Sequence, residues 1–354
     1  MVFHHNLFLR CLLISTLVTP TRSLIISSKL FSKLHIPRDY HPESPARISS
    51  ILQHLEQKYE IVEPNNTPGH LDRALAAIKG VHDHAYVDAV KIRSQRGAPY
   101  LQPYDLDTYL STTSYDCSLL AQCAWLDCLD YLVENNNHNF AYAITRPPGH
   151  HAEHKSGEGF CIFNFAAATA VYAVSNKLVK NVSILDFDVH YGNGVSDIVQ
   201  NHTSIRYASL HQMDIYPVPP KPDGILSSSP NRNVLTVNLE PYFKITNYME
   251  KLNEVVMPFL TGAHSHCSID QSLTHSLITT DPEHKPDLLI VCAGYDGLAS
   301  DELASGGLQC QDYKTISEAI KRHFKGPVLF GLEGGYNLRD MPIAVAASIE
   351  PFAP

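Results

Sequence analysis

Residues 182–190 read VSILDFDVH, and this stretch decides the fold of the 354-residue chain. Its first half is a run of mostly apolar residues, which is typical of a strand buried on both faces of a sheet. Because side chains alternate along a strand, Asp186, Asp188 and His190 fall on one face and Phe187 falls on the other. Two carboxylates and an imidazole at the end of a buried strand indicate a metal site.

Two more segments place polar residues directly after apolar runs. They are RPPGHH at 146–151 and AGYD at 293–296. Ligands of open α/β sheets bind beyond the carboxyl ends of the strands, so we expect His150, His151 and Asp296 to meet there. Two carboxylates and an imidazole in open coordination, with a histidine pair nearby, are the parts of a zinc hydrolase.

Apolar, β-rich runs recur along the chain with helical patterns between them. They occupy residues 24–27, 140–145, 182–186, 205–210, 234–239, 287–293 and 327–332. Strands of this kind alternating with helices predict a mostly parallel sheet covered on both faces, and therefore an α/β fold. No internal repeat and no clean boundary interrupts the pattern, so we expect a single three-layer α/β/α domain over residues 24–354.

Two helices and two loops are predicted between the strands. Residues 114–134 form an amphipathic pattern with Ser114 as a possible cap and a stripe made of Cys117, Ala121, Ala124, Cys128 and Leu132. Residues 160–178 are alanine-rich and apolar on all sides, which predicts a deeply buried helix. The proline-rich stretch 216–230 and the His/Ser/Thr-rich stretch 262–286 are expected to be surface insertions.

The composition excludes some functional classes. Hydrophobic residues make up 44% of the chain and charged residues 18%, as in a well-buried globular enzyme. The net charge of −9 and the pI near 6.1 argue against direct nucleic-acid binding, which needs a basic face. The eight cysteines show no CxxC pair, so we expect reduced thiols and a reducing compartment.

The N-terminus differs in composition from the rest of the chain. No Asp or Glu precedes Asp39, and the apolar run at 11–18 is too short to span a membrane. We interpret residues 1–23 as a targeting peptide for an organelle (plastid or mitochondrion) or for secretion. The alternative is a plain extension on a protein of the cytoplasm or nucleus.

Seven motifs, taken together and in order, resemble the histone deacetylase superfamily. They are HPESPAR at 41–47, RPPGHH at 146–151, GFCIFN at 159–164, DFDVHYGNG at 186–194, SLH at 209–211, AGYD at 293–296 and LEGGYN at 332–337. The details are more similar to the class II and acetylpolyamine amidohydrolase branches than to class I. The resemblance implies the arginase/deacetylase fold and a zinc-dependent amidohydrolase. Its expected substrates are acetyl-lysine in proteins or acetylated polyamines.

The resemblance also implies roles for individual residues. Asp188, His190 and Asp296 would bind one Zn²⁺ per chain. The tandem pair His150 and His151 would transfer protons. The remaining roles fall to Asp186 and Asn193, which would orient His150 and His151, and to Tyr336, which would donate its hydroxyl to the oxyanion.

Further positions carry over at the edges of the site. Gly159 and Phe160 would line a narrow substrate tunnel, and the loop that contains Tyr216 would shape its rim. Arg47 would face an internal cavity below the metal. Asp186 and Ser209, with backbone carbonyls near Leu210, resemble a structural potassium site.

Departures from the family pattern leave alternatives open. Tyr191 replaces a second histidine, and residues 214–220 replace a glycine-rich loop at the tunnel rim. A binding protein for acyl-lysine with little catalysis is therefore the first alternative. A binuclear ureohydrolase of the related arginase fold is the second, but residues 190–193 lack its bridging aspartates. The histidines at 264, 266, 275 and 284 are interpreted as a solvated loop, and the oligomeric state is left open.

Overall fold

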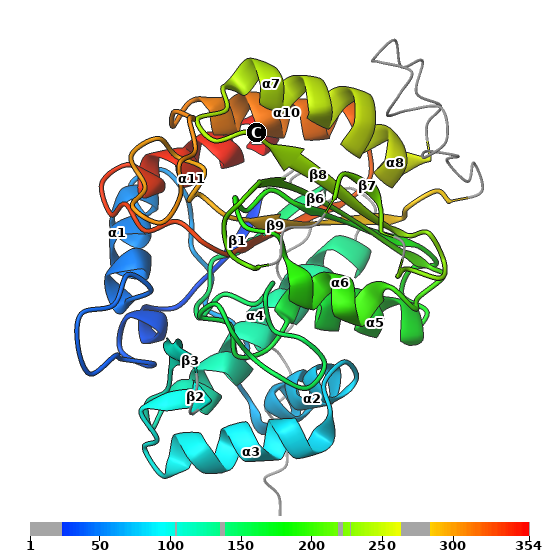
Figure 1. The fold of residues 1–354 in the computed structure, drawn as a ribbon. Coiled ribbons are helices and arrows are strands. Elements are labelled where there is room, and N and C mark those ends of the chain that lie inside the picture. The colour runs from blue at the N-terminus through cyan, green and yellow to red at the C-terminus, as the bar shows by residue number, and fades with distance from the viewer. Residues whose placement is uncertain are drawn as a thin grey trace, which may run out of the picture.

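A central sheet organises the computed structural model, which describes residues 23–102, 105–134, 139–218, 222–226, 228–262 and 284–353 (Figure 1). Within these residues the sheet has eight strands in the order β1-β4-β10-β9-β5-β6-β8-β7. All neighbouring strands are parallel except β7, which runs antiparallel to β8. The strands are β1 (Leu24–Ile26), β4 (Phe140–Ala143), β5 (Val182–Asp186), β6 (Ile205–Gln212), β7 (Gly224–Ile225), β8 (Val234–Leu239), β9 (Leu288–Ala293) and β10 (Val328–Leu332).

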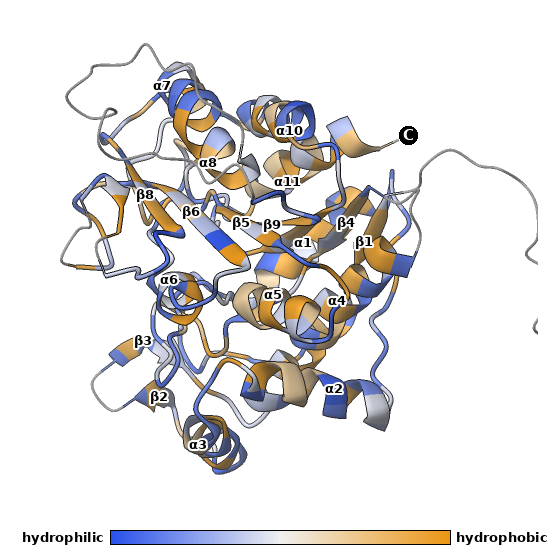
Figure 2. Ribbon diagram, turned by 90° about the vertical axis from the view of Figure 1, so that its right-hand side faces the viewer, coloured by the Kyte–Doolittle hydropathy of each residue, from blue (hydrophilic) through white to orange (hydrophobic). Residues whose placement is uncertain are grey.

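Helices cover both faces of this sheet, so the predicted three-layer α/β/α architecture is confirmed. Figures 1 and 2 show α4, α5 and α6 on one face and α7, α8, α10 and α11 on the other. The helices are α1 (Pro45–Leu55), α2 (Pro68–Lys79), α3 (His84–Gln95), α4 (Ser114–Glu134), α5 (Phe165–Ser175), α6 (Asn193–Val199), α7 (Ile245–Lys251), α8 (Met257–Thr261), α10 (Asp312–His323) and α11 (Met341–Ile349). Short turns of other helix types occupy Lys29–Ser32, Leu252–Val256 and Glu350–Phe352.

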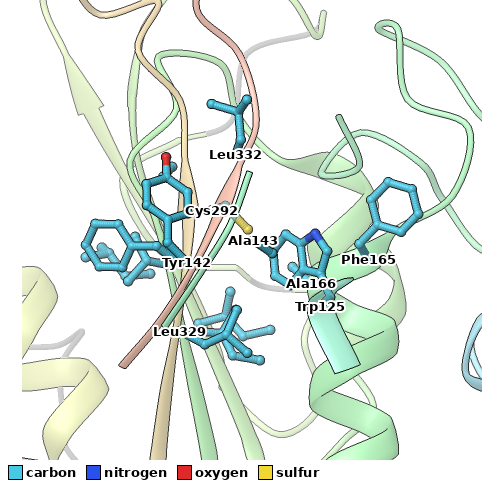
Figure 3. Packing of buried hydrophobic residues seen from close by; sticks show 14 of the residues in the cluster. Trp125, Tyr142, Ala143, Phe165, Ala166, Cys292, Leu329 and Leu332 are labelled. Atoms are coloured by element: carbon cyan, nitrogen blue, oxygen red, sulfur yellow. The ribbon is translucent and has the colours of Figure 1, made fainter. Parts of the chain in front are cut away.

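The apolar core lies on both sides of the central strands. Figure 3 shows Trp125 of α4 on one side of the sheet and Tyr142 of β4 on the other. Trp125 packs directly over Gly331 of β10, where any Cβ would overlap the indole ring. The indole Nε1 donates a hydrogen bond to Thr145 Oγ1 at 3.3 Å, so the buried polar atom is satisfied.

The predicted helix at 114–134 coincides with α4, and every member of its predicted stripe is buried. The capping role of Ser114 was wrong. Ser114 is the first helical residue, and its hydroxyl accepts a hydrogen bond from the N–H of Ser111, outside the helix.

The helix predicted at 160–178 begins later, at Phe165. Gly159 and Phe160 have positive φ angles of 54° and 70°, which a helix excludes. Asn164 then caps α5 by accepting a hydrogen bond from Ala167 N at 3.0 Å. The apolar composition therefore correctly predicts that α5 is buried, but it places the start of the helix five residues too early.

Three short strands were missed. β7 lies inside the stretch predicted as a loop at 216–230. A separate antiparallel pair, β2 (Tyr100–Gln102) and β3 (Asp105–Tyr109), precedes α4. Strands of two to five residues are too short to produce a readable alternation.

Other expectations fall partly outside the described residues. Residues 1–22 of the predicted leader lie there, as do the histidines at 264, 266 and 275. The interpretation of His284 as solvated was wrong, because its side chain is buried and Nε2 lies 3.1 Å from Ser183 Oγ. The cysteines within the described ranges are free thiols. Among the described helices, none combines the length and the apolar character that crossing a bilayer requires.

Candidate active site

The sheet brings the motif segments together at one edge. β4, β10, β9 and β5 are consecutive neighbours in the sheet, and each is followed at its carboxyl end by one of the predicted segments. RPPGHH follows β4, the end of LEGGYN follows β10, GYD follows β9 and FDVH follows β5. The expectation that these side chains meet at this edge is therefore confirmed.

Asp188, His190 and Asp296 form a candidate metal site. One ligand atom from each lies within 4.8 Å of the others, and both carboxylates are fully buried. His190 Nδ1 is 3.2 Å from Asp188 Oδ1 and 3.0 Å from Asp296 Oδ2. Burial and the adjacent Asp188 carboxylate raise the pKa of Asp296 to about 7. Two carboxylates converging in a buried place fit a divalent cation, which would keep both ionised.

Backbone groups hold these carboxylates in place. Gly334 N donates to Asp188 Oδ2 at 2.8 Å, and Val189 N donates to Asp296 Oδ1 at 3.0 Å. A Cβ on Gly334 would lie 2.6 Å from Asp188 Oδ2 and nearer still to Asp296 Oδ2. Gly334 is therefore required by the close approach of its backbone to both carboxylates.

The two histidines of the tandem pair have different partners. Their ring centroids are 3.9 Å apart. His150 Nδ1 lies 3.1 Å from Asp186 Oδ2, an oxygen that also accepts from the Tyr207 hydroxyl at 2.8 Å. His151 Nδ1 lies 2.7 Å from Asn193 Oδ1. The pairings expected for Asp186 and Asn193 are thus both present.

These surroundings move the two imidazole pKa values apart. Burial opposes the charge on His150, but the carboxylates of Asp188 and Asp186 outweigh it and raise its pKa to about 10. Burial and the neighbouring His150 and His190 hold the pKa of His151 well below its ordinary value. The neighbouring carboxylates thus favour the charged form of His150 and burial favours the neutral form of His151, which is the separation expected of an acid and a base.

A cavity of about 410 Å³ leads to this cluster. Its wall includes Gly159, Phe160, Tyr216 and Tyr336, and both His150 and His151 line it. The Phe160 and Tyr336 rings pack edge-to-face with their centroids 5.7 Å apart. The Tyr216 and His151 rings do the same with their centroids 4.9 Å apart. The predicted tunnel residues therefore line one passage with the histidine pair.

Comparison with known proteins places the chain in a family. The family model for the histone deacetylase domain matches residues 41–351. The chain belongs to the histone deacetylase family. An uncharacterised protein of Synechocystis is 34% identical over 88% of this chain and 93% of that protein. Histone deacetylase 14, chloroplastic, of Arabidopsis thaliana is 29% identical over 88% of the chain and 72% of its own length.

A solved structure shares the fold of this family member. The crystal structure of the HDA15 HD domain matches with a TM-score of 0.76 and 25% identity. The match covers 94% of this chain and 90% of that one.

Arg47 and Ser209 lie next to residues of the candidate site. The Arg47 guanidinium is buried 4.9 Å from the centre of the Tyr336 ring and donates to the backbone carbonyls of Gly335, at 2.7 Å, and Glu333. Ser209 pairs with Asp186 across β5 and β6, and its hydroxyl lies 2.9 Å from His211 Nδ1. An internal cavity at Arg47 and a potassium site near Ser209 and Leu210 stay predictions.

Sequence reasoning missed Glu333, although it stands within the quoted LEGGYN motif. Its Oε2 accepts from Gly149 N at 2.6 Å and from His150 N at 3.1 Å, so it anchors the histidine segment. Burial raises its pKa to about 7. His150, Cys161 and Glu333 also form a group of possible metal ligands. However, His150 already pairs with Asp186, and burial raises the pKa of the Cys161 thiol, which disfavours the thiolate.

Proposed function

We propose that this protein is a zinc-dependent amidohydrolase that removes acetyl or other acyl groups from acetyl-lysine in proteins or from acetylated polyamines. The supporting observation is the convergence of Asp188, His190 and Asp296 beside two histidines with opposite pKa shifts. Carboxylates and an imidazole suit Zn²⁺, and when bound the metal would polarise the acyl carbonyl and lower the pKa of water.

The histidine pair supplies the proton transfers. His151, which is neutral, takes a proton from the attacking water as the water oxygen bonds to the acyl carbon. The amide C–N bond then breaks, and the departing nitrogen receives a proton from the pair, which yields a free amine and the carboxylate. His150, held charged by Asp186, stabilises negative charge that develops during the attack.

Tyr336 and the tunnel walls complete the site. The Tyr336 hydroxyl donates a hydrogen bond to the oxyanion that forms from the acyl oxygen. The backbone N–H of Tyr336 is fixed by Asp301 Oδ2 at 2.7 Å, so the position of the ring depends on that carboxylate. Gly159, Phe160 and Tyr216 surround the aliphatic chain of the substrate and exclude water from it.

We extend the proposal to a structural potassium ion and to the cellular compartment of the protein. We assign a structural K⁺ to Asp186, Ser209 and the carbonyl of Leu210, where β5 and β6 lie side by side. We also propose that residues 1–23 direct the protein to an organelle, since a relative carries "chloroplastic" in its name. A plastid enzyme would act mainly on proteins other than nuclear histones.

Turnover by the full chain tests the proposal. Purified protein of known metal content is assayed with an acetyl-lysine peptide and with acetylputrescine, and Tyr336→Phe is the matched control. We expect turnover that a chelator abolishes and that the variant loses by about 100-fold or more, the scale of one oxyanion donor. Tight substrate binding without turnover in the metal-loaded protein would favour the acyl-lysine binding protein instead.

A further inference from the structure

The side chain behind His151 is itself held by two carboxylates. Asn193 Nδ2 lies 3.0 Å from Glu153 Oε1 and 2.6 Å from Glu158 Oε1, while Asn193 Oδ1 faces His151 Nδ1 at 2.7 Å. All four side chains are buried or half-buried. A chain of contacts therefore runs from the two glutamates through one amide to the imidazole.

The chemistry of these groups decides which way the amide faces. A carboxylate only accepts hydrogen bonds, so the amide atom shared by Glu153 and Glu158 must be the nitrogen. That leaves Asn193 Oδ1, a pure acceptor, against His151 Nδ1. A neutral imidazole must then carry its proton on Nδ1 and its lone pair on Nε2. The hydrogen-bond partners of Asn193 therefore decide which end of its amide is the oxygen and which is the nitrogen.

We propose that Glu153 and Glu158 are positioning residues that fix the base-competent tautomer of His151. This inference rests on the proposed function, because it is the Nε2 lone pair that would accept the proton of water. Asp186 needs no such support, since a carboxylate presents an acceptor to His150 in either orientation. The Asn193 amide can rotate by half a turn and exchange its oxygen and nitrogen. Its orientation therefore depends on partners that only accept hydrogen bonds, which Glu153 and Glu158 supply.

The backbone around Glu153 keeps this carboxylate in place. Glu153 N donates to Ser156 O at 2.8 Å, and Glu153 O lies 2.8 Å from His82 Nδ1. Glu158 lies beside Gly159 and lines the active-site cavity. The residues that orient Asn193 are thus anchored on the segment that links the histidine pair to the tunnel wall.

Removing both acceptors should release the amide. In Glu153→Ala/Glu158→Ala, Asn193 can also turn its NH₂ towards His151 Nδ1, which exchanges the Nδ1–H···Oδ1 bond for an N–H···Nδ1 bond and moves the histidine proton to Nε2. The two orientations of the amide then make equal numbers of hydrogen bonds to the imidazole, so both tautomers should be populated and kcat should fall at least about twofold. Glu158→Ala alone, at a half-buried cavity position, gives a partial effect and guards against a double variant that fails to fold.

Asn193→Asp supplies the decisive comparison. A carboxylate accepts in either orientation, so Asn193→Asp in the double alanine variant should return the histidine proton to Nδ1 and raise kcat above that of the double variant. In the wild-type background the same change places three carboxylates together and should lower kcat. Asp197→Asn removes a nearby carboxylate that is not bonded to the amide, and it should leave kcat unchanged.

The tautomer is read directly from ¹⁵N shifts of the two ring nitrogens in histidine-labelled full-length protein, assigned by difference from His151→Gln. We expect the proton on Nδ1 in wild type, shared between Nδ1 and Nε2 in the double variant, and on Nδ1 again after Asn193→Asp. An unchanged Nδ1 proton and kcat in the double variant would overturn the inference. Absence of turnover in every protein, with the shifts as predicted, would overturn the proposed function and support the tautomer assignment.

Discussion

The buried ion pair between Glu43 and Arg146 should be a major determinant of stability. Arg146 Nε and Nη2 each donate to a different oxygen of Glu43 at 2.8 Å, and both side chains are fully buried. The remaining guanidinium donors reach the Tyr109 hydroxyl and the carbonyls of Phe31 and Leu34. Arg146→Met therefore removes both short charge-assisted hydrogen bonds from the buried Glu43 carboxylate and leaves the carbonyls of Phe31 and Leu34 without this donor.

The expected loss in the free energy of unfolding is about 3 kcal/mol, within the range of about 3–5 kcal/mol for breaking a buried pair. The low end applies because Arg47 Nη1, 3.5 Å from Glu43 Oε1, still faces the carboxylate. Urea unfolding followed by fluorescence of Trp125, the single tryptophan, measures it directly. Arg339→Met, on the exposed surface, is the matched control and should change nothing measurable.

A double-mutant cycle separates the pair from the general cost of each substitution. Glu43→Gln should also destabilise the protein, whereas Glu43→Gln/Arg146→Met should lose less than the sum of the single variants by about 2 kcal/mol. Additive losses, or a loss below about 1 kcal/mol for Arg146→Met, would refute the reasoning.

Two other perturbations have defined outcomes. Gly334→Ala should abolish metal binding, because its Cβ meets the Asp188 and Asp296 carboxylates, whereas Gly69→Ala, whose Cβ meets nothing within 4 Å, should not; retention of one metal in Gly334→Ala would contradict the site. His82 should make the fold acid-sensitive, since burial lowers its pKa from 6.5 to about 4 while Nε2 accepts from Asn164 N. The unfolded chain binds this proton first, so stability should fall by about 3 kcal/mol from pH 6.5 to 4. Urea midpoints measure this, and His82→Gln should flatten the slope; an unchanged slope would exclude His82 as its source.

Much of the fold could be predicted because the signals are local and strong. Val182–Asp186 and Val234–Leu239 are continuous apolar runs, which parallel strands produce when helices cover both faces. Gly224–Ile225 carries no such signal, because two residues cannot show a period. The start of α5 was misplaced since backbone angles at Gly159 and Phe160, not hydrophobicity, decide where the helix can begin.

The residues of the candidate site also fall into those that the sequence predicts and those that it does not. The convergence of Asp188, His190 and Asp296 could be predicted because each follows a strand at an edge where ligands bind. Glu153, Glu158 and Glu43 were missed as partners, because hydrogen bonds between segments depend on the folded geometry. A half-buried glutamate that orients an amide is indistinguishable in sequence from one on a solvated surface.

The metal content of the purified full-length protein tests the central claim most directly. Elemental analysis should find one divalent ion, zinc, per chain in the wild type and none in Asp188→Ala. A wild-type protein that binds no metal under zinc-replete conditions would contradict the account. Two ions per chain would contradict it as well and would point to a binuclear hydrolase.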